Sequence, residues 1–131
     1  MKLSVGIKSR WKPLKHTNTF INAANGIGYA IQQEVNMRIH AVAAGTAIAT
    51  GCMLGLSAME WGIVIGCIVL VISLELVNTA IEVLCNLITT DFNSQIKIIK
   101  DVAAGAVLIA AIGSAIIGAI IFLPKIIHLI Y

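Results

Sequence analysis

Three long apolar runs, separated by short polar connections, restrict this chain to very few folds. A run of about 20 residues is what an α-helix needs to cross the hydrocarbon core of a bilayer. The predicted spans cover residues 39–56, 61–87 and 102–123 of the 131-residue chain. They leave one N-terminal segment and short loops, with no room for a separate soluble domain. The sequence therefore predicts an all-α integral membrane protein with a single domain over residues 1–131.

The composition agrees with this class. Hydrophobic side chains make up 59% of the residues and charged ones 11%, whereas a soluble domain carries about 25% charged residues. The net charge of +3 does not indicate nucleic-acid binding, because the basic residues are concentrated before the first span and not spread over a soluble surface. The cysteines lie inside apolar runs without a CxxC pair and are expected to be small core residues. They are Cys52, Cys67 and Cys85.

Two segments precede the first span. Residues 1–18 form a basic tail, expected to lie on anionic headgroups or to be poorly ordered. Residues 19–37 place apolar side chains at helical spacing with Asn, Gln and Glu in the gaps, which is too polar for a span. This segment is predicted to be an amphipathic surface helix in the cytoplasmic interface, with simple packing against the bundle as the alternative.

The charges that flank the apolar runs predict the topology. Lysine and arginine gather on the cytoplasmic side of membrane proteins, and here they precede the first span, so the N-terminus is predicted to be cytoplasmic. The turn at residues 57–60 has neither residue type and is predicted to face away from the cytoplasm. The second span then runs inward and the connection at residues 89–100 is cytoplasmic. The third span runs outward and is predicted to end at Pro124 and Lys125.

A polar stripe interrupts the second span near its inner end. At about 100° per residue, five polar residues fall within a roughly 100° arc of one helix face. They are Glu75, Asn78, Thr79, Glu82 and Asn86. An acidic residue at the centre of a span costs about 2.5 to 3.5 kcal/mol on insertion scales, and less near the ends, so the two glutamates need a partner or a task. The stripe therefore predicts a functional site at the cytoplasmic boundary of the membrane.

The stripe and two further segments resemble a known family. Residues 75–82, Glu-Leu-Val-Asn-Thr-Ala-Ile-Glu, and residues 100–106, Lys-Asp-Val-Ala-Ala-Gly-Ala, are similar to the signature of the prokaryotic diacylglycerol kinase family. Residues 34–40, Glu-Val-Asn-Met-Arg-Ile-His, resemble the segment before the first span in its undecaprenol kinase branch. The resemblance implies a homotrimeric lipid kinase of the bacterial inner (cytoplasmic) membrane, with three spans, a surface helix and a cytoplasmic active site.

The resemblance also implies roles for individual residues. Glu75 would be the general base that takes the proton from the lipid hydroxyl, and Glu34 and Glu82 would hold Mg²⁺ on the co-substrate ATP. Phosphoryl transfer requires charge neutralisation, in-line positioning and a carboxylate near the attacking hydroxyl, which suits these residue types. The residues expected to contact the nucleotide phosphates or to order the site are Asn78, Asn86, Lys100 and Asp101.

Some positions depart from the family pattern. Asn86 stands where many relatives carry aspartate, while Phe92 and Asn93 stand where some carry tyrosine and histidine near the nucleotide. The sequence contains no GxxxxGK[ST] phosphate-binding loop, so the expectation of ATP rests on the resemblance. The acceptor is a lipid alcohol, either undecaprenol or diacylglycerol, and the segment at residues 34–40 favours undecaprenol.

The acidic residues also allow interpretations other than a kinase site. The two glutamates of the stripe could be neutralised by protonation, or by Lys100 and Arg38, to lock the helices together. Asp101 could cap the third span. The alternative function is a non-enzymatic membrane protein, such as a transporter subunit or an assembly factor, with an intramembrane carboxylate relay. A relay needs ionisable groups spaced through the bilayer, and the outer half of every predicted span has none. The sequence therefore favours the kinase.

Overall fold

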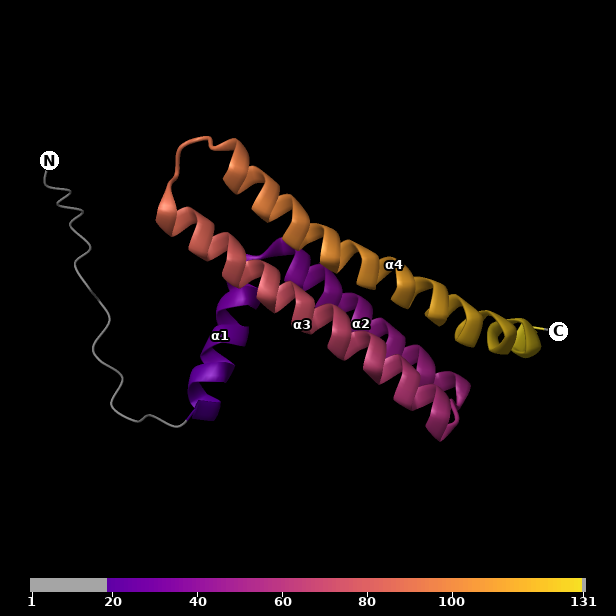
Figure 1. Ribbon diagram of the computed structural model, residues 1–131. Helices are drawn as coiled ribbons and strands as arrows, with labels where there is room; N and C mark the ends of the chain where they lie inside the picture. The colour runs from indigo at the N-terminus through magenta and orange to yellow at the C-terminus, as the bar shows by residue number, and fades with distance from the viewer. Residues whose placement is uncertain (1–18, 131) are drawn as a thin grey trace, which may run out of the picture.

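The structure is a computed structural model that describes residues 19–130, so the predicted basic tail lies outside the described residues. The described chain is helical throughout, apart from its connections. Its four helices are α1 (Thr19–Gln33), α2 (Val35–Leu54), α3 (Ala58–Ile88) and α4 (Ser94–Ile130). Figure 1 shows α2, α3 and α4 running alongside one another, with α1 leaving the bundle at a steep angle.

Three of the helices are long and apolar enough to cross a membrane. They are α2, α3 and α4, with 20, 31 and 37 residues. At about 1.5 Å per residue, each reaches the roughly 30 Å thickness of a hydrocarbon core. The predicted all-α architecture with three membrane-spanning helices is therefore confirmed. The extra length of α3 and α4 lets both helices continue beyond the core into the interface.

The helix break before the first span comes earlier than the sequence indicated. The predicted surface helix ran to residue 37, whereas α1 ends at Gln33 and α2 begins at Val35. Glu34 between them has extended backbone angles (φ −103°, ψ 122°). Its N–H still donates to the carbonyl of Ala30 at 2.9 Å. Because no glycine or proline stands at the break, the local sequence gives no signal for it.

The turn between α2 and α3 is tightly specified by local contacts. Gly55 ends α2 in the left-handed region (φ 63°), which favours glycine. Ser57 and Glu60 then form a capping box at the start of α3, with the Ser57 N–H donating to Glu60 Oε2 at 2.7 Å. Trp61 lies over Gly51, where an added Cβ would be 2.9 Å from the indole ring. The absence of a side chain at Gly51 thus permits close approach of the two helices.

Both ends of α4 differ from the predicted third span. The connection is short, because Asn93 Oδ1 accepts from the N–H groups of Gln95 and Ile96 at 2.9 and 3.3 Å and starts the helix there. Asp101 therefore lies inside α4, and the reading that it caps the third span is wrong. At the other end the helix continues through Pro124, which was predicted to end it. Membrane helices tolerate the loss of the backbone hydrogen bond that a proline removes.

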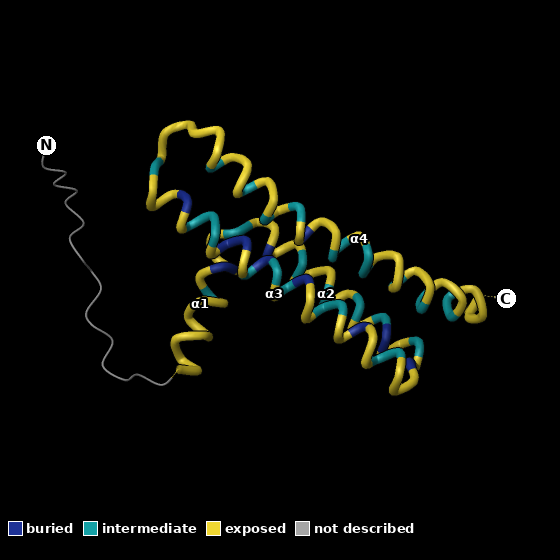
Figure 2. Tube along the Cα trace, viewed as in Figure 1, coloured by how far each residue is buried: buried dark blue, intermediate teal, exposed yellow. Residues whose placement is uncertain are grey.

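The core of the described chain is narrow, as the few dark blue positions in Figure 2 show. Most large apolar side chains point outward, towards lipid or towards other protein. Of the cysteines expected in the core, Cys85 is buried, while Cys67 is half-buried and Cys52 is exposed. That expectation is wrong for Cys52, because an apolar run in a membrane helix does not distinguish the core face from the outer face. The buried apolar residues are Ala30, Met37, Leu56, Val64, Val71, Cys85 and Val107.

Candidate active site

The polar stripe on α3 is buried inside the bundle. Glu75, Asn78 and Thr79 are only 1%, 4% and 4% exposed. Glu82, one turn further along the helix, is half-buried, and Asn86 at the end of the stripe is exposed. The stripe thus runs from the bundle interior to the surface of α3. The helical periodicity correctly predicted that these side chains share a face.

Three side-chain atoms of the stripe lack a hydrogen-bond partner among the described residues. They are Glu75 Oε1, Asn78 Oδ1 and Thr79 Oγ1. A buried polar atom left without a partner costs about 1 to 3 kcal/mol, and more for a charged group. Such atoms in a native protein are satisfied by a ligand, an ion or water. The stripe therefore presents buried polar atoms that a ligand, an ion or water can satisfy.

The neighbouring amide and carboxylate of the stripe are joined. Asn78 Nδ2 donates to Glu82 Oε1 at 3.3 Å across one helical turn. This bond fixes which end of the Asn78 amide faces Glu82, and it leaves the amide oxygen available to another donor or cation. It also leaves the second carboxylate oxygen of Glu82 for other contacts. Asn78 consequently orients Glu82.

The break between α1 and α2 brings a third carboxylate to the site. Glu34 occupies the N-cap position of α2, and its side chain makes no capping hydrogen bond. Glu75 interacts electrostatically with His40, Glu82 and Glu34. Glu82 lies on the same helix as Glu75, whereas His40 lies on α2 and Glu34 directly precedes α2. The structure therefore brings together the three glutamates singled out in the sequence, and adds His40.

Two lysines of α4 lie at the exposed end of the site. Lys100 Nζ donates to Asn86 Oδ1 on α3 at 2.7 Å, which joins two residues expected to bind the nucleotide. Asp101 forms an ion pair with Lys97. Lys97 is thereby neutralised, whereas Lys100 is held by an uncharged amide. Lys100 thus keeps its positive charge for an anionic ligand.

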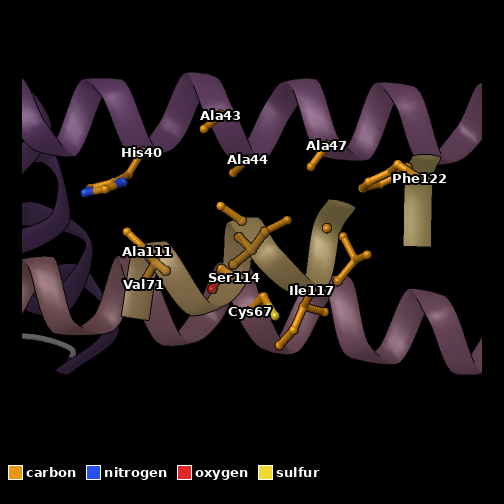
Figure 3. A pocket seen from close by; sticks show the side chains of 14 residues that line it. His40, Ala43, Ala44, Ala47, Cys67, Val71, Ala111, Ser114, Ile117 and Phe122 are labelled. Carbon is orange, nitrogen blue, oxygen red and sulfur yellow. The ribbon is translucent and has the colours of Figure 1, made fainter. Parts of the chain in front are cut away.

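An apolar cavity of about 300 Å³ lies between α2, α3 and α4. Figure 3 shows small side chains of α2 on one wall, the imidazole of His40 at one end and Phe122 at the other. Val71 of α3 lines the cavity, and Glu75 follows it by one helical turn. The sequence analysis missed this cavity because its walls come from three separate helices. Its one local signal is the run of alanines on α2, at Ala43, Ala44 and Ala47.

Comparison with known proteins identifies the family. The model of the prokaryotic diacylglycerol kinase family matches residues 21–122. This chain belongs to the prokaryotic diacylglycerol kinase family. The resemblance inferred from residues 75–82 and 100–106 is therefore confirmed. Membership makes the chain a lipid kinase, and a non-enzymatic protein with a carboxylate relay is not favoured.

Two relatives of this chain carry different names. A protein of Bacillus subtilis called undecaprenol kinase is 44% identical over 107 residues, which cover 82% of this chain and 87% of the relative. A protein of Synechocystis sp. called diacylglycerol kinase is 37% identical over 112 residues, which cover 85% of this chain and 64% of that relative. The family thus contains kinases named for two different acceptor lipids.

The carboxylates of the site do not form a complete metal cage. In the part of the chain that the structure describes, no group of three or more His, Cys, Asp or Glu side chains is placed to hold a metal ion. A magnesium ion in a kinase is usually held by one or two carboxylates, with the remaining ligands supplied by substrate phosphates and water. The donor set of Glu34 and Glu82 fits this second kind of site.

Proposed function

We propose that this chain transfers the γ-phosphate of ATP to the hydroxyl group of a membrane lipid alcohol at the cytoplasmic boundary of the bilayer. The observation that carries the proposal is the buried carboxylate of Glu75, whose Oε1 has no hydrogen-bond partner among residues 19–130. It lies one helical turn from Val71 of the apolar cavity on one side and about one turn from Asn78 on the other, and Asn78 in turn bonds Glu82. A lipid hydroxyl and a nucleotide can therefore approach it from opposite sides.

Glu75 acts as the general base. As the hydroxyl oxygen of the lipid forms a bond to the γ-phosphorus, the bond from that phosphorus to the β,γ-bridging oxygen breaks, and ADP leaves. The hydroxyl proton passes to Glu75. The contribution of the chain is to hold the hydroxyl, the phosphate and the carboxylate in line, since positioning and charge stabilisation supply most of the catalysis in phosphoryl transfer.

Glu34 and Glu82 hold the magnesium ion that accompanies ATP. Glu34 is suited to this role because its carboxylate is not used as a helix cap. Glu82 is suited because Asn78 bonds only one of its carboxylate oxygens. When bound, magnesium neutralises charge on the phosphates. The role of these two glutamates is to set the position of that charge relative to Glu75.

Residues of α3 and α4 bind the nucleotide phosphates at the exposed end of the site. Lys100 is the cation of this subsite, and Asn86 holds it in place at 2.7 Å. Asn78 contributes the second N–H of its side-chain amide, since the first donates to Glu82. Asp101 acts through its ion pair with Lys97, which keeps this end of α4 ordered. The phosphate charge therefore meets one uncompensated lysine.

The acceptor places its hydrocarbon part in the apolar cavity between α2, α3 and α4. Among the two acceptor classes, undecaprenol is favoured, because the relative with that name matches this chain at 44% identity and along 87% of its length. Diacylglycerol is the second candidate, in keeping with the relative at 37% identity. The two lipids differ in headgroup and in tail, while both offer one free hydroxyl.

The surroundings of the site belong to the same proposal. Residues 1–131 form a single kinase domain of a bacterial inner membrane, with the N-terminus on the cytoplasmic side and α1 lying as an amphipathic helix in the interface. The chain works as a homotrimer. Self-association is supported by the size of the chain, because so small a bundle encloses little of a polar site by itself and neighbouring subunits can complete it.

A direct transfer assay tests the proposal. Purified protein in detergent or vesicles is given γ-labelled ATP with undecaprenol in one reaction and diacylglycerol in another. Label is expected in undecaprenyl phosphate, with less in phosphatidic acid. The Glu75→Gln variant serves as the matched control, because it keeps the shape of the side chain and removes the base. Absence of label from both lipids with the wild-type protein would overturn the proposed function.

A further inference from the structure

His40 occupies the end of the apolar cavity that lies towards the polar site. In Figure 3 its imidazole extends from α2 into the space between α2 and α3. The facing walls are formed mostly by alanine, valine and isoleucine, so His40 introduces polar nitrogens where the lining is otherwise mainly apolar. It is half-buried, and no hydrogen bond to a described residue explains its position.

The same end of the cavity lies close to the catalytic carboxylate. Val71 and Ala111 appear beside His40 at that end of the cavity. Glu75 follows Val71 by four residues, which is about 6 Å along the axis of α3. His40 and Glu75 also interact electrostatically. The imidazole therefore lies at the junction between the cavity and Glu75.

We propose that His40 binds the hydroxyl group of the acceptor lipid, by donating a ring N–H to the hydroxyl oxygen at the mouth of the apolar cavity. The inference rests on the proposed function, because it concerns the acceptor of that reaction. It assigns a binding role to a residue that neither the stripe nor the family signature at residues 75–82 and 100–106 contains.

The hydrogen-bonding capacity of a hydroxyl group supports this arrangement. A hydroxyl has one hydrogen to donate and two lone pairs that accept. Glu75 Oε1, which is buried and has no partner in the described part of the chain, offers an acceptor for the hydrogen. A donor from the opposite side then fixes the rotation of the C–O bond, so that the hydrogen points at Glu75 and a lone pair is left for the phosphorus. His40 is the lining side chain that supplies an N–H donor at this end of the cavity.

The test separates binding of the hydroxyl from binding of the hydrocarbon tail. The variants His40→Ala and His40→Gln are compared with the wild type for the KM of the acceptor, the KM of ATP, and the inhibition constant of an acceptor analogue in which hydrogen replaces the hydroxyl. Loss of one neutral hydrogen bond is expected to raise the acceptor KM about threefold to tenfold in His40→Ala. The ATP KM and the inhibition constant of the analogue are expected to stay unchanged.

The two comparison variants sharpen the result. His40→Gln keeps an N–H donor and is expected to recover part of the acceptor affinity. Ala47→Leu places a larger side chain in the cavity from the same helix. It is expected to weaken the binding of the acceptor and of the hydroxyl-free analogue to the same extent. Both histidine variants are compared only as protein that elutes like the wild type from a sizing column in detergent.

Three outcomes would overturn the inference. A parallel rise of the acceptor KM and of the analogue's inhibition constant in His40→Ala would mean that His40 only shapes the cavity. A rise confined to the ATP KM would place His40 on the nucleotide side. Unchanged constants would mean that His40 does not contact the acceptor. A wild-type protein that labels neither lipid would instead refute the proposed function, whatever the His40 variants do.

Discussion

Burial separates the three glutamates of the site at the scale of single residues. Glu75 is 1% exposed, whereas Glu34 and Glu82 are half-buried. A carboxylate that accepts a proton benefits from exclusion of water, while carboxylates that hold a magnesium–phosphate complex have to be reached from the aqueous side. The order of burial therefore agrees with one base and two metal ligands.

Replacing Glu75 by glutamine is expected to abolish turnover and to leave nucleotide binding intact. The substitution is nearly isosteric and removes only the ability to accept the proton. Loss of a general base typically lowers the rate by about 10² to 10⁴. Steady-state transfer of label from ATP and binding of a fluorescent ATP analogue measure the two properties. A variant that keeps more than about a tenth of the wild-type rate would contradict the role of Glu75.

Glu34 and Glu82 are expected to act as a unit if they share one magnesium ion. Glu34→Gln and Glu82→Gln should each raise the magnesium concentration needed for half-maximal activity. Because each single change already weakens the binding of the same ion, the double variant should lose much less magnesium affinity than the sum of the two single losses. Magnesium titrations of all three variants measure this coupling. Additive effects would show that the two carboxylates work separately.

Asn86 is expected to tune the charge that Lys100 offers to ATP. The Asn86→Asp change would turn the hydrogen bond of 2.7 Å into an ion pair that competes with the phosphates for Lys100. The KM of ATP should rise, while the KM of the lipid stays unchanged. Asn86→Leu is the matched control, because it removes the bond without adding charge. Equal effects of both variants would mean that only the orientation of Lys100 matters.

At the scale of the elements, the sequence predicts what depends on local periodicity and misses what depends on contacts. The three spans follow from length and hydropathy, and the shared face of Glu75 and Glu82 follows from the 3.6-residue repeat. The break at Glu34 has no glycine or proline to mark it. Pro124, in contrast, is a helix-breaking signal that the membrane helix overrides.

The close contact between α2 and α3 provides a prediction at this scale. An alanine at Gly51 would place its Cβ 2.9 Å from the ring of Trp61, so the hairpin has to shift. Overpacking of this kind costs about 1 to 3 kcal/mol. Gly45→Ala on the same helix is the control, because its Cβ meets nothing within 4 Å. Thermal unfolding in detergent should show a lower midpoint for Gly51→Ala only, and equal midpoints would contradict the packing.

At the scale of the whole molecule, contacts between distant parts of the chain complete the site that the polar stripe predicts. The glutamates could be selected from the sequence because their charge conflicts with the apolar runs and because of the family signature. The cavity and the place of His40 could not, because α2, α3 and α4 each contribute only a few unremarkable side chains to it. The ion pair of Glu60 and Lys125 at 3.2 Å likewise joins distant parts of the chain at the opposite end of the bundle.

The orientation of the molecule in the membrane decides whether ATP can reach the site. The turn between α2 and α3 is expected to face away from the cytoplasm, because it carries neither Lys nor Arg, and the connection between α3 and α4 is expected to be cytoplasmic. Single cysteines test this in a variant whose native cysteines are replaced by alanine. Met59 and Phe92 are suitable positions, since they are 78% and 86% exposed, and Met59 lies at the start of α3 while Phe92 lies in the connection between α3 and α4.

A membrane-impermeant thiol reagent should label Phe92→Cys only in inside-out vesicles and Met59→Cys only in right-side-out vesicles. Both positions avoid Ser57 and Asn93, whose side chains cap helices and whose loss would disturb the turns. Labelling of each variant in the presence of detergent shows that the thiol is reactive. If Met59→Cys were labelled from the cytoplasmic side, Glu82 would face away from cellular ATP. The inverted topology would then contradict the cytoplasmic kinase site, because phosphoryl transfer needs the nucleotide and the lipid hydroxyl at the same carboxylate.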